Sequence, residues 1–112
     1  MSRIYRTQPK THRNAVTQQD TEDPTLEKGI KTTGYQECRF DITLEGEDVR
    51  KLTLRLLFYN YRVNLWFTGA FYELKSAGQH SITALVRSAT VFLWVDSFEG
   101  TSFKLTADYS LS

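Results

Sequence analysis

Apolar and polar residues alternate one by one along most of the chain after residue 35. Residues 36–45 give the clearest case, because a polar side chain follows each apolar one. The apolar positions in this segment are Cys38, Phe40, Ile42 and Leu44. A period of two residues is typical of a β-strand that buries one face and exposes the other. We therefore expect a half-buried strand at residues 36–45.

The same reasoning predicts seven strands, joined by short segments that contain turn-forming residues. The expected strands are residues 36–45, 49–59, 61–68, 71–75, 80–87, 90–96 and 101–111. The apolar parity changes at Asn60-Tyr61 without a gap, which predicts a bulge or a tight turn there. No segment has the 3.6-residue period of a helix. The sequence thus predicts an all-β fold, an antiparallel β-sandwich of about seven strands, similar to a jelly roll.

The first 33 residues have a different character, because they contain few apolar side chains and follow neither period. Such a segment cannot bury enough apolar surface to fold by itself. We therefore divide the chain into an extended N-terminal arm, residues 1–33, and a β-sandwich domain, residues 34–112. Basic but no acidic side chains occupy the first nineteen residues. The residues expected to bind a partner through this arm are Arg3, Tyr5, Arg6, Lys10 and Arg13.

Few side chains suggest catalysis or cofactor binding. The two histidines, His12 and His80, are far in sequence from Cys38, the single cysteine, so no metal-ligand spacing occurs. Ser81 follows His80 directly, but adjacent residues of a strand point to opposite faces, and no nucleophile-elbow motif is present. We therefore predict no enzymatic activity, no cofactor and no metal site.

Charge and cysteine content narrow the class of partner. The 14 basic and 13 acidic residues give a net charge of +1, and the four Lys and Arg side chains in the first nineteen residues would release few counterions from a nucleic acid. Nucleic-acid binding, as in the coat proteins of RNA viruses, is therefore not expected. No apolar run reaches the roughly 20 residues of a membrane span, so we expect no membrane association. A single cysteine excludes an internal disulfide and fits synthesis in a reducing compartment.

Three aromatic residues lie either on a strand that is apolar on both faces or on the more polar face of their strand. These residues are Trp66, Phe92 and Trp94. They are compatible with a second packed layer of the same sandwich, with a buried subunit interface, or with a platform on which a glycan stacks. The sequence leaves these three interpretations open.

Two segments resemble small β-sandwich virion proteins of tailed bacteriophages. Residues 76–87, with the sequence SAGQHSITALVR, are similar to a strand entry in these proteins, and the hairpin FEGTSFKL at residues 98–105 is of a similar kind. Proteins of this class serve as trimeric decoration or cement proteins on a capsid, or as fibre and collar modules. No catalytic residue carries over from them.

The resemblance implies a structural protein of the virion, made in the host cytoplasm and acting as a capsid decoration or cement protein. In this hypothesis the sandwich forms a homotrimer through Trp66, Phe92 and Trp94, and the arm binds the major capsid protein or another virion protein. The alternatives are a receptor- or glycan-binding module at a fibre tip and an assembly component of the tail or neck.

Overall fold

The computed structural model describes residues 7–19 and 21–112, and these residues form strands and no helix. The strands are β1 (Lys10–Thr17), β2 (Ile30–Lys31), β3 (Glu37–Glu47), β4 (Lys51–Asn60), β5 (Leu65–Leu74), β6 (Gly78–Leu85), β7 (Thr90–Glu99) and β8 (Ser102–Leu111). No helix in this part of the chain is long and apolar enough to cross a membrane. The fold class is therefore all-β, as predicted.

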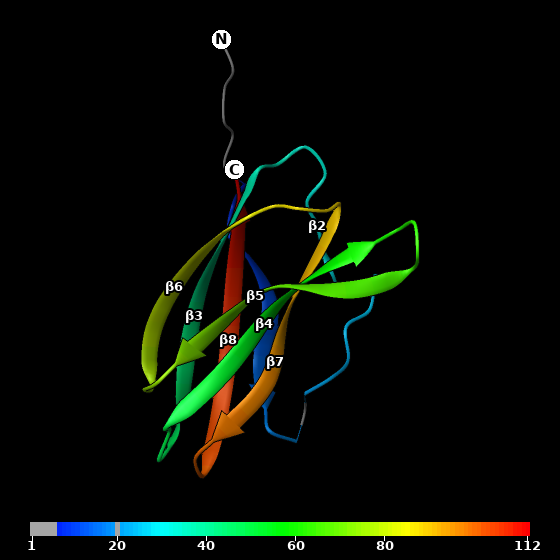
Figure 1. The fold of residues 1–112 in the computed structure, drawn as a ribbon. Helices are drawn as coiled ribbons and strands as arrows, with labels where there is room; N and C mark the ends of the chain where they lie inside the picture. Colours follow the sequence, from blue (N-terminus) through cyan, green and yellow to red (C-terminus); the bar gives the residue numbers. More distant parts are fainter. Residues whose placement is uncertain (1–6, 20) are drawn as a thin grey trace.

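The strands form two four-stranded antiparallel sheets that lie face to face (Figure 1). The first sheet has the order β1-β8-β3-β6, and the second has the order β2-β7-β4-β5. The longest pairing joins β3 to β8 over ten residue pairs, from Cys38 opposite Leu111 to Glu47 opposite Ser102. The predicted packing of antiparallel sheets in a sandwich-like arrangement is confirmed.

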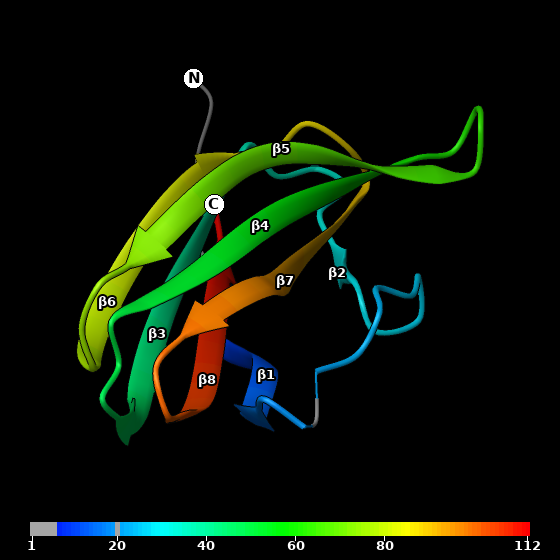
Figure 2. The same cartoon turned by 60° about the horizontal axis from the view of Figure 1, so that its bottom comes forward.

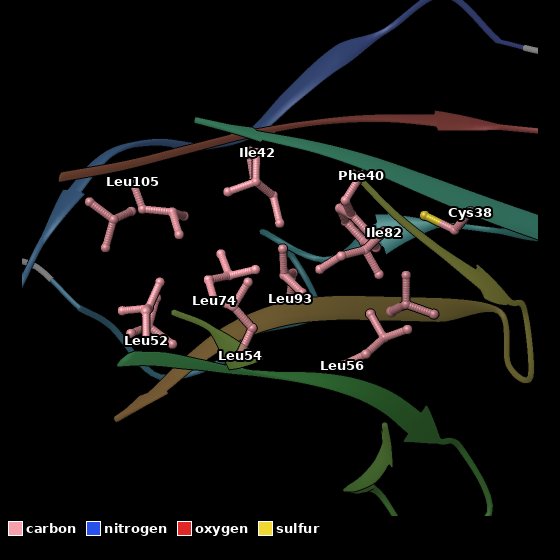
Figure 3. Packing of buried hydrophobic residues seen from close by; sticks show 14 of the residues in the cluster. Cys38, Phe40, Ile42, Leu52, Leu54, Leu56, Leu74, Ile82, Leu93 and Leu105 are labelled. Carbon is pink, nitrogen blue, oxygen red and sulfur yellow. The ribbon is translucent and has the colours of Figure 1, made fainter. Parts of the chain in front are cut away.

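Apolar side chains from both sheets meet in one core between them (Figure 3). Phe40 and Ile42 of β3 and Leu105 of β8 come from the first sheet, and they face Leu54 and Leu93 of the second sheet. All five are at most 1% exposed. The alternation in the sequence predicted these positions, because each strand turns every second side chain toward the opposite sheet.

Cys38 lies in the same core as a free, buried thiol. Its burial raises the pKa of the thiol to about 12, because the thiolate would lose its hydration there. The thiol therefore stays protonated at neutral pH and is a poor nucleophile.

The parity change at residue 60 marks a tight turn. The main-chain N–H of Asn64 donates to the carbonyl oxygen of Asn60 at 2.8 Å, and Asn64 has a φ of 57°. Asparagine tolerates this left-handed conformation better than most residues. The prediction of a turn here is confirmed, but the two strands expected at 61–68 and 71–75 are one continuous strand, β5.

The segment predicted to be an extended arm contributes two strands to the sandwich. Strand β1 pairs antiparallel with β8, and β2 pairs antiparallel with β7. Val16 and Ile30 are buried in the common core. The expected boundary between residues 33 and 34 therefore does not separate packed units. The number of strands is eight in the described residues, instead of about seven.

Main-chain pairing explains why the pattern of residues 1–33 gave no sign of these strands. The N–H and C=O groups that join β1 to β8 are present in almost every residue, so polar side chains do not prevent pairing. The register of β1 also shifts twice, between Thr11 and Arg13 and between Arg13 and Val16, and Ala15 has a φ of 56°. These irregularities remove the period of two.

The β4–β5 hairpin is the most prominent projection of the fold. Its turn extends beyond the body of the two sheets (Figure 2). The hairpin carries a bulge at Gly69, which has no Cα partner on β4, whereas Thr68 pairs with Leu57 and Ala70 pairs with Leu56. An extra residue at this place bends the strand and increases its local twist.

Candidate interaction surface

The three aromatic residues expected at an interface or on a glycan platform lie near one another on the outer side of the second sheet. Phe92 is 0% exposed, and Trp66 and Trp94 are partly buried. The rings of Trp66 and Phe92 are 6.1 Å apart between centroids and lie edge to face. The structure thus places Trp66 against Phe92 but leaves Phe92 no exposed surface of its own.

The N-terminal segment covers Phe92. The ring of His12 lies 5.0 Å from the Phe92 ring in an edge-on arrangement, and the Arg13 guanidinium lies 5.0 Å from the centre of the same ring. The Trp94 indole N–H donates to the carbonyl oxygen of Glu22 at 3.1 Å. Of the three interpretations of these aromatic residues, the geometry at Phe92 agrees best with a second packed layer.

Arg13 holds this layer in place and is 3% exposed. Its Nη1 donates to a carboxylate oxygen of Glu22 at 3.2 Å, whereas its Nε and Nη2 have no hydrogen-bond partner among the described residues. Burial lowers the pKa of Arg13, and the Glu22 carboxylate partly opposes this shift. Arg13 therefore lies inside the fold and is not accessible to a partner, contrary to its expected role. Lys10 is exposed, and Arg3, Tyr5 and Arg6 lie outside the described residues.

His12 joins the two sheets at their edge. Its Nε2 accepts a hydrogen bond from the main-chain N–H of Leu93 at 3.1 Å. The rings of Phe40, Phe92 and Tyr109 surround it at centroid distances of 5.0 to 6.2 Å. Burial, with a smaller contribution from the positive charge of Arg13, lowers the pKa of His12 from 6.5 to about 3. The ring is therefore neutral at pH 7 and acts as an acceptor.

A stack of side chains crosses the outer side of the second sheet beside Trp94. The guanidinium of Arg55 lies 5.2 Å from the Trp94 ring and 5.0 Å from the Phe71 ring, and its Nη2 donates to Asp96 at 2.6 Å. A cation between two aromatic faces is attracted by both. This arrangement occupies one face of Trp94.

The large exposed apolar side chains gather on and beside the β4–β5 hairpin instead. In the described part of the chain, the large hydrophobic side chains that are exposed have fractional exposures of 50% to 64%. They are Tyr61, Val63, Leu65, Phe67, Phe71 and Leu85. We call these six residues the β5 patch, because all except Leu85 lie on β5 or on the turn that precedes it. Leu65 and Phe67 lie on the inner face of the second sheet, whereas Phe71, which pairs with Arg55, lies on its outer face, so the patch surrounds the β5 edge. Exposed apolar side chains that gather in one region are typical of an interaction site.

Two side chains of the β5 patch lie on the inner face of the second sheet. Phe67 pairs with Phe58, and Leu65 pairs with Asn60, so both lie on the inner face of their sheet. The alternation of residues 61–68 could not reveal that this end of the hairpin projects past the opposite sheet, which leaves part of the inner face exposed (Figure 2).

A hollow of about 500 Å³ lies at the base of the hairpin. Its wall combines apolar rings with polar groups of the β6–β7 connection. The residues that line it include Phe58, Tyr61, Phe67, Gly69, Arg87 and Ala89. The Tyr61 hydroxyl and the Thr90 hydroxyl share a hydrogen bond of 2.6 Å, which holds the turn against β7.

Gly69 allows the hairpin to pass close to Phe58. A Cβ atom at position 69 would overlap the Phe58 ring, which is 8% exposed and belongs to the core. We expect Gly69→Ala to lower the free energy of unfolding by about 1–3 kcal/mol, because the ring must move into a packed core. Thr68→Ala, at an exposed neighbouring position, is the control and should cost much less. Equal costs for the two variants in chemical denaturation would show that the contact with Phe58 does not limit position 69.

Metal binding has no support in the described residues, where no group of three or more His, Cys, Asp or Glu side chains could hold a metal ion. Comparison with known proteins gives no relative: no protein-family model, no curated protein and no solved structure matches the chain. A functional proposal for this chain therefore relies on its own residues, its geometry and its strand order.

Proposed function

We propose that this chain is a structural protein of a virion, of the capsid decoration or cement type, with a jelly-roll fold. The observation that carries the proposal is the strand order. The hydrogen-bonded neighbours β1 and β8, β2 and β7, β3 and β6, and β4 and β5 are the pairs that form when one long antiparallel ribbon rolls up. This order supports a jelly roll, an eight-stranded architecture that occurs in viral capsid proteins, lectins and cupins.

Two further observations support an assembly role within this architecture. The β5 patch exposes six large apolar side chains around the β5 edge, as expected of a protein that binds other proteins. The segments at residues 76–87 and 98–105 resemble virion proteins of tailed bacteriophages. A fold alone does not determine function, so the patch and the resemblance are needed beside the strand order.

Attachment to the capsid is assigned to the basic N-terminus. Arg3 and Arg6 precede the first strand, and the exposed Lys10 begins it. In this proposal these cations, with Tyr5, bind an acidic surface of the major capsid protein. Several weak contacts in one oligomer would add up to a high avidity. Arg13 takes no part in attachment, because it is buried against Phe92.

Charge reversal at the N-terminus tests this assignment. We expect Arg3→Glu combined with Arg6→Glu to reduce the number of copies on purified particles several-fold, because like charges would then face each other. The circular dichroism spectrum and melting temperature of the purified chain should not change. Lys75→Glu combined with Lys104→Glu reverses two exposed charges elsewhere and is the matched control.

Particle occupancy is measured by quantitative immunoblotting and immunogold labelling of particles from a density gradient. Equal occupancy of the wild type and the Arg3/Arg6 variant would contradict attachment through the N-terminus. Absence of the chain from purified particles would contradict the virion proposal itself.

A glycan-binding module has weaker support. Jelly rolls include lectin domains, and a second hollow of about 360 Å³ on the outer face of β3 and β6 is lined mainly by polar residues. The aromatic platform expected for a sugar is largely occupied, however, since the Trp94 N–H is bonded to Glu22 and one face of its ring meets Arg55. Assembly through the β5 patch is the function that the geometry supports best.

A further inference from the structure

We propose that two copies of this chain associate through the β5 edge, with their β5 strands antiparallel about a two-fold axis. This inference identifies the partner of the β5 patch as a second copy, and it rests on the proposed assembly function for its biological role. The aromatic face of Trp66, Phe92 and Trp94 is not the interface in this arrangement. A two-fold dimer replaces the trimer implied by the resemblance.

The size of the patch agrees with what a stable dimer needs. Each of its six side chains is at least half exposed. An aromatic side chain that buries about 150–250 Å² when fully enclosed leaves roughly 100 Å² at half exposure, and the three aliphatic members leave somewhat less, so the patch offers roughly 500 Å² of apolar surface. A standard protein interface buries about 800 Å² on each partner, including its polar rim. The patch thus supplies most of one such interface.

Strand β5 is also an open edge. It pairs with β4 on one side only, so the main-chain groups on its other side have no strand partner among the described residues. Natural edge strands are usually short, or they carry Lys, Pro or bulges that prevent pairing with another chain. Strand β5 is ten residues long, contains no Lys, Arg or Pro, and has Glu73 as its only charged residue. It carries one of these devices, the bulge at Gly69, which divides the edge into two regular segments.

The other three edge strands of the two sheets differ from β5 in length, charge or apolar exposure. Strand β1 carries Lys10 and Arg13 and has two register shifts, and β2 is only two residues long. Strand β6 is a second edge without Lys, Arg or Pro, but its only large exposed apolar residue is Leu85. The apolar surface and the long open edge therefore coincide at β5.

Charge favours the antiparallel orientation. Glu73 lies near one end of β5, and Arg62 lies in the exposed turn beyond the other end. An antiparallel pair separates the two Glu73 side chains and brings each one toward the partner's hairpin turn. A parallel pair would place the like charges side by side, which destabilises neighbouring strands. Because the same surface serves both copies, the contact closes and does not propagate into a fibre.

The first experiment measures the mass of the full chain by light scattering and by sedimentation equilibrium. Between about 1 and 100 µM we expect the mass to rise toward twice 13.0 kDa. Leu65→Lys combined with Phe67→Lys should remain a monomer, since both substitutions place a charge in the contact. Thr83→Lys combined with Thr101→Lys adds the same charge at exposed positions outside the patch and should dimerise like the wild type.

A cysteine crosslink identifies the edge that is used. Cys38 is replaced by serine, and Thr68→Cys places a single thiol near the middle of β5, where the two-fold axis would pass. Opposed positions in an antiparallel pair are close enough for a disulfide, so mild oxidation should give a covalent dimer. Thr83→Cys on β6, in the same background, should not crosslink.

The possible outcomes separate this inference from the proposed function. A wild-type monomer at about 100 µM overturns the self-association and assigns the β5 patch to a foreign protein. A dimer that crosslinks through position 83 instead of 68 overturns the choice of edge. Both outcomes leave the chain's presence on particles to be measured independently, so failure of the dimer does not imply failure of the virion proposal.

Discussion

Phe92→Ala is expected to lower the free energy of unfolding by about 3–5 kcal/mol, which is a large part of the stability of a small domain. Phe92 points away from the central core, to the outer side of β7. It is nevertheless completely buried, because His12, Arg13 and Trp66 surround it. Its removal would leave a cavity in this outer layer. It would also leave the Arg13 guanidinium beside an empty space. Two nitrogens of this guanidinium already have no hydrogen-bond partner among the described residues.

This prediction tests whether the N-terminal segment belongs to the fold. An arm that extends freely from the sandwich would leave Phe92 exposed, and truncation of an exposed side chain usually changes stability by less than about 0.5 kcal/mol. Equilibrium denaturation in urea measures the difference. Phe67→Ala, which removes the same side chain at a half-exposed position, is the matched control and should cost much less. Equal, small costs for both variants would contradict the packing of residues 12 and 13 on β7.

The stability of the chain is expected to fall as the pH decreases from about 6.5 toward 3, owing to His12. In the unfolded chain this imidazole takes up a proton near its usual pKa of 6.5, whereas in the folded chain its pKa is about 3. Between these two pKa values the unfolded state binds more protons than the folded state. The free energy of unfolding therefore decreases as the pH falls through this range. The stabilisation is complete above pH 6.5 and decreases by up to about 1.4 kcal/mol for each pH unit below it.

His12→Gln isolates this contribution, since glutamine is uncharged at every pH and still carries an acceptor oxygen. Unfolding free energies of both chains at pH 7, 6 and 5 give the comparison, because most carboxylates remain ionised over this range. The wild type should lose stability steadily, and the variant should lose much less. Parallel curves for the two chains would show that His12 is accessible to solvent and does not accept the Leu93 hydrogen bond.

Together these two experiments examine the layer formed by β1 and the segment up to Glu22. The apolar contribution of this layer is small, but it encloses His12 and Arg13, two polar side chains that cannot be buried without partners. Leu93 donates to His12, and Glu22 accepts from one of the three guanidinium nitrogens of Arg13. The layer is therefore stable only when the chain is folded around β7 and β8.

The core strands could be predicted from the sequence because their signal is local. Residues such as Phe40, Ile42 and Leu105 alternate with polar neighbours, and a period of two has one structural meaning in a half-buried sheet. The turn at residues 61–64 was also predictable, since a change of parity requires extra chain length. The all-β class and the positions of most strands after residue 35 follow from this pattern alone.

Tertiary structure decided what the pattern could not contain. Strand β1 joins the sheet through main-chain hydrogen bonds with β8, which lies about ninety residues further along the chain, and such bonds leave no trace in side-chain polarity. The burial of Phe92, Arg13 and His12 depends on that long-range contact. The exposure of Phe67 depends on the hairpin extending past the opposite sheet. Local alternation determined which face each strand presents, whereas contacts between distant segments determined whether that face is covered.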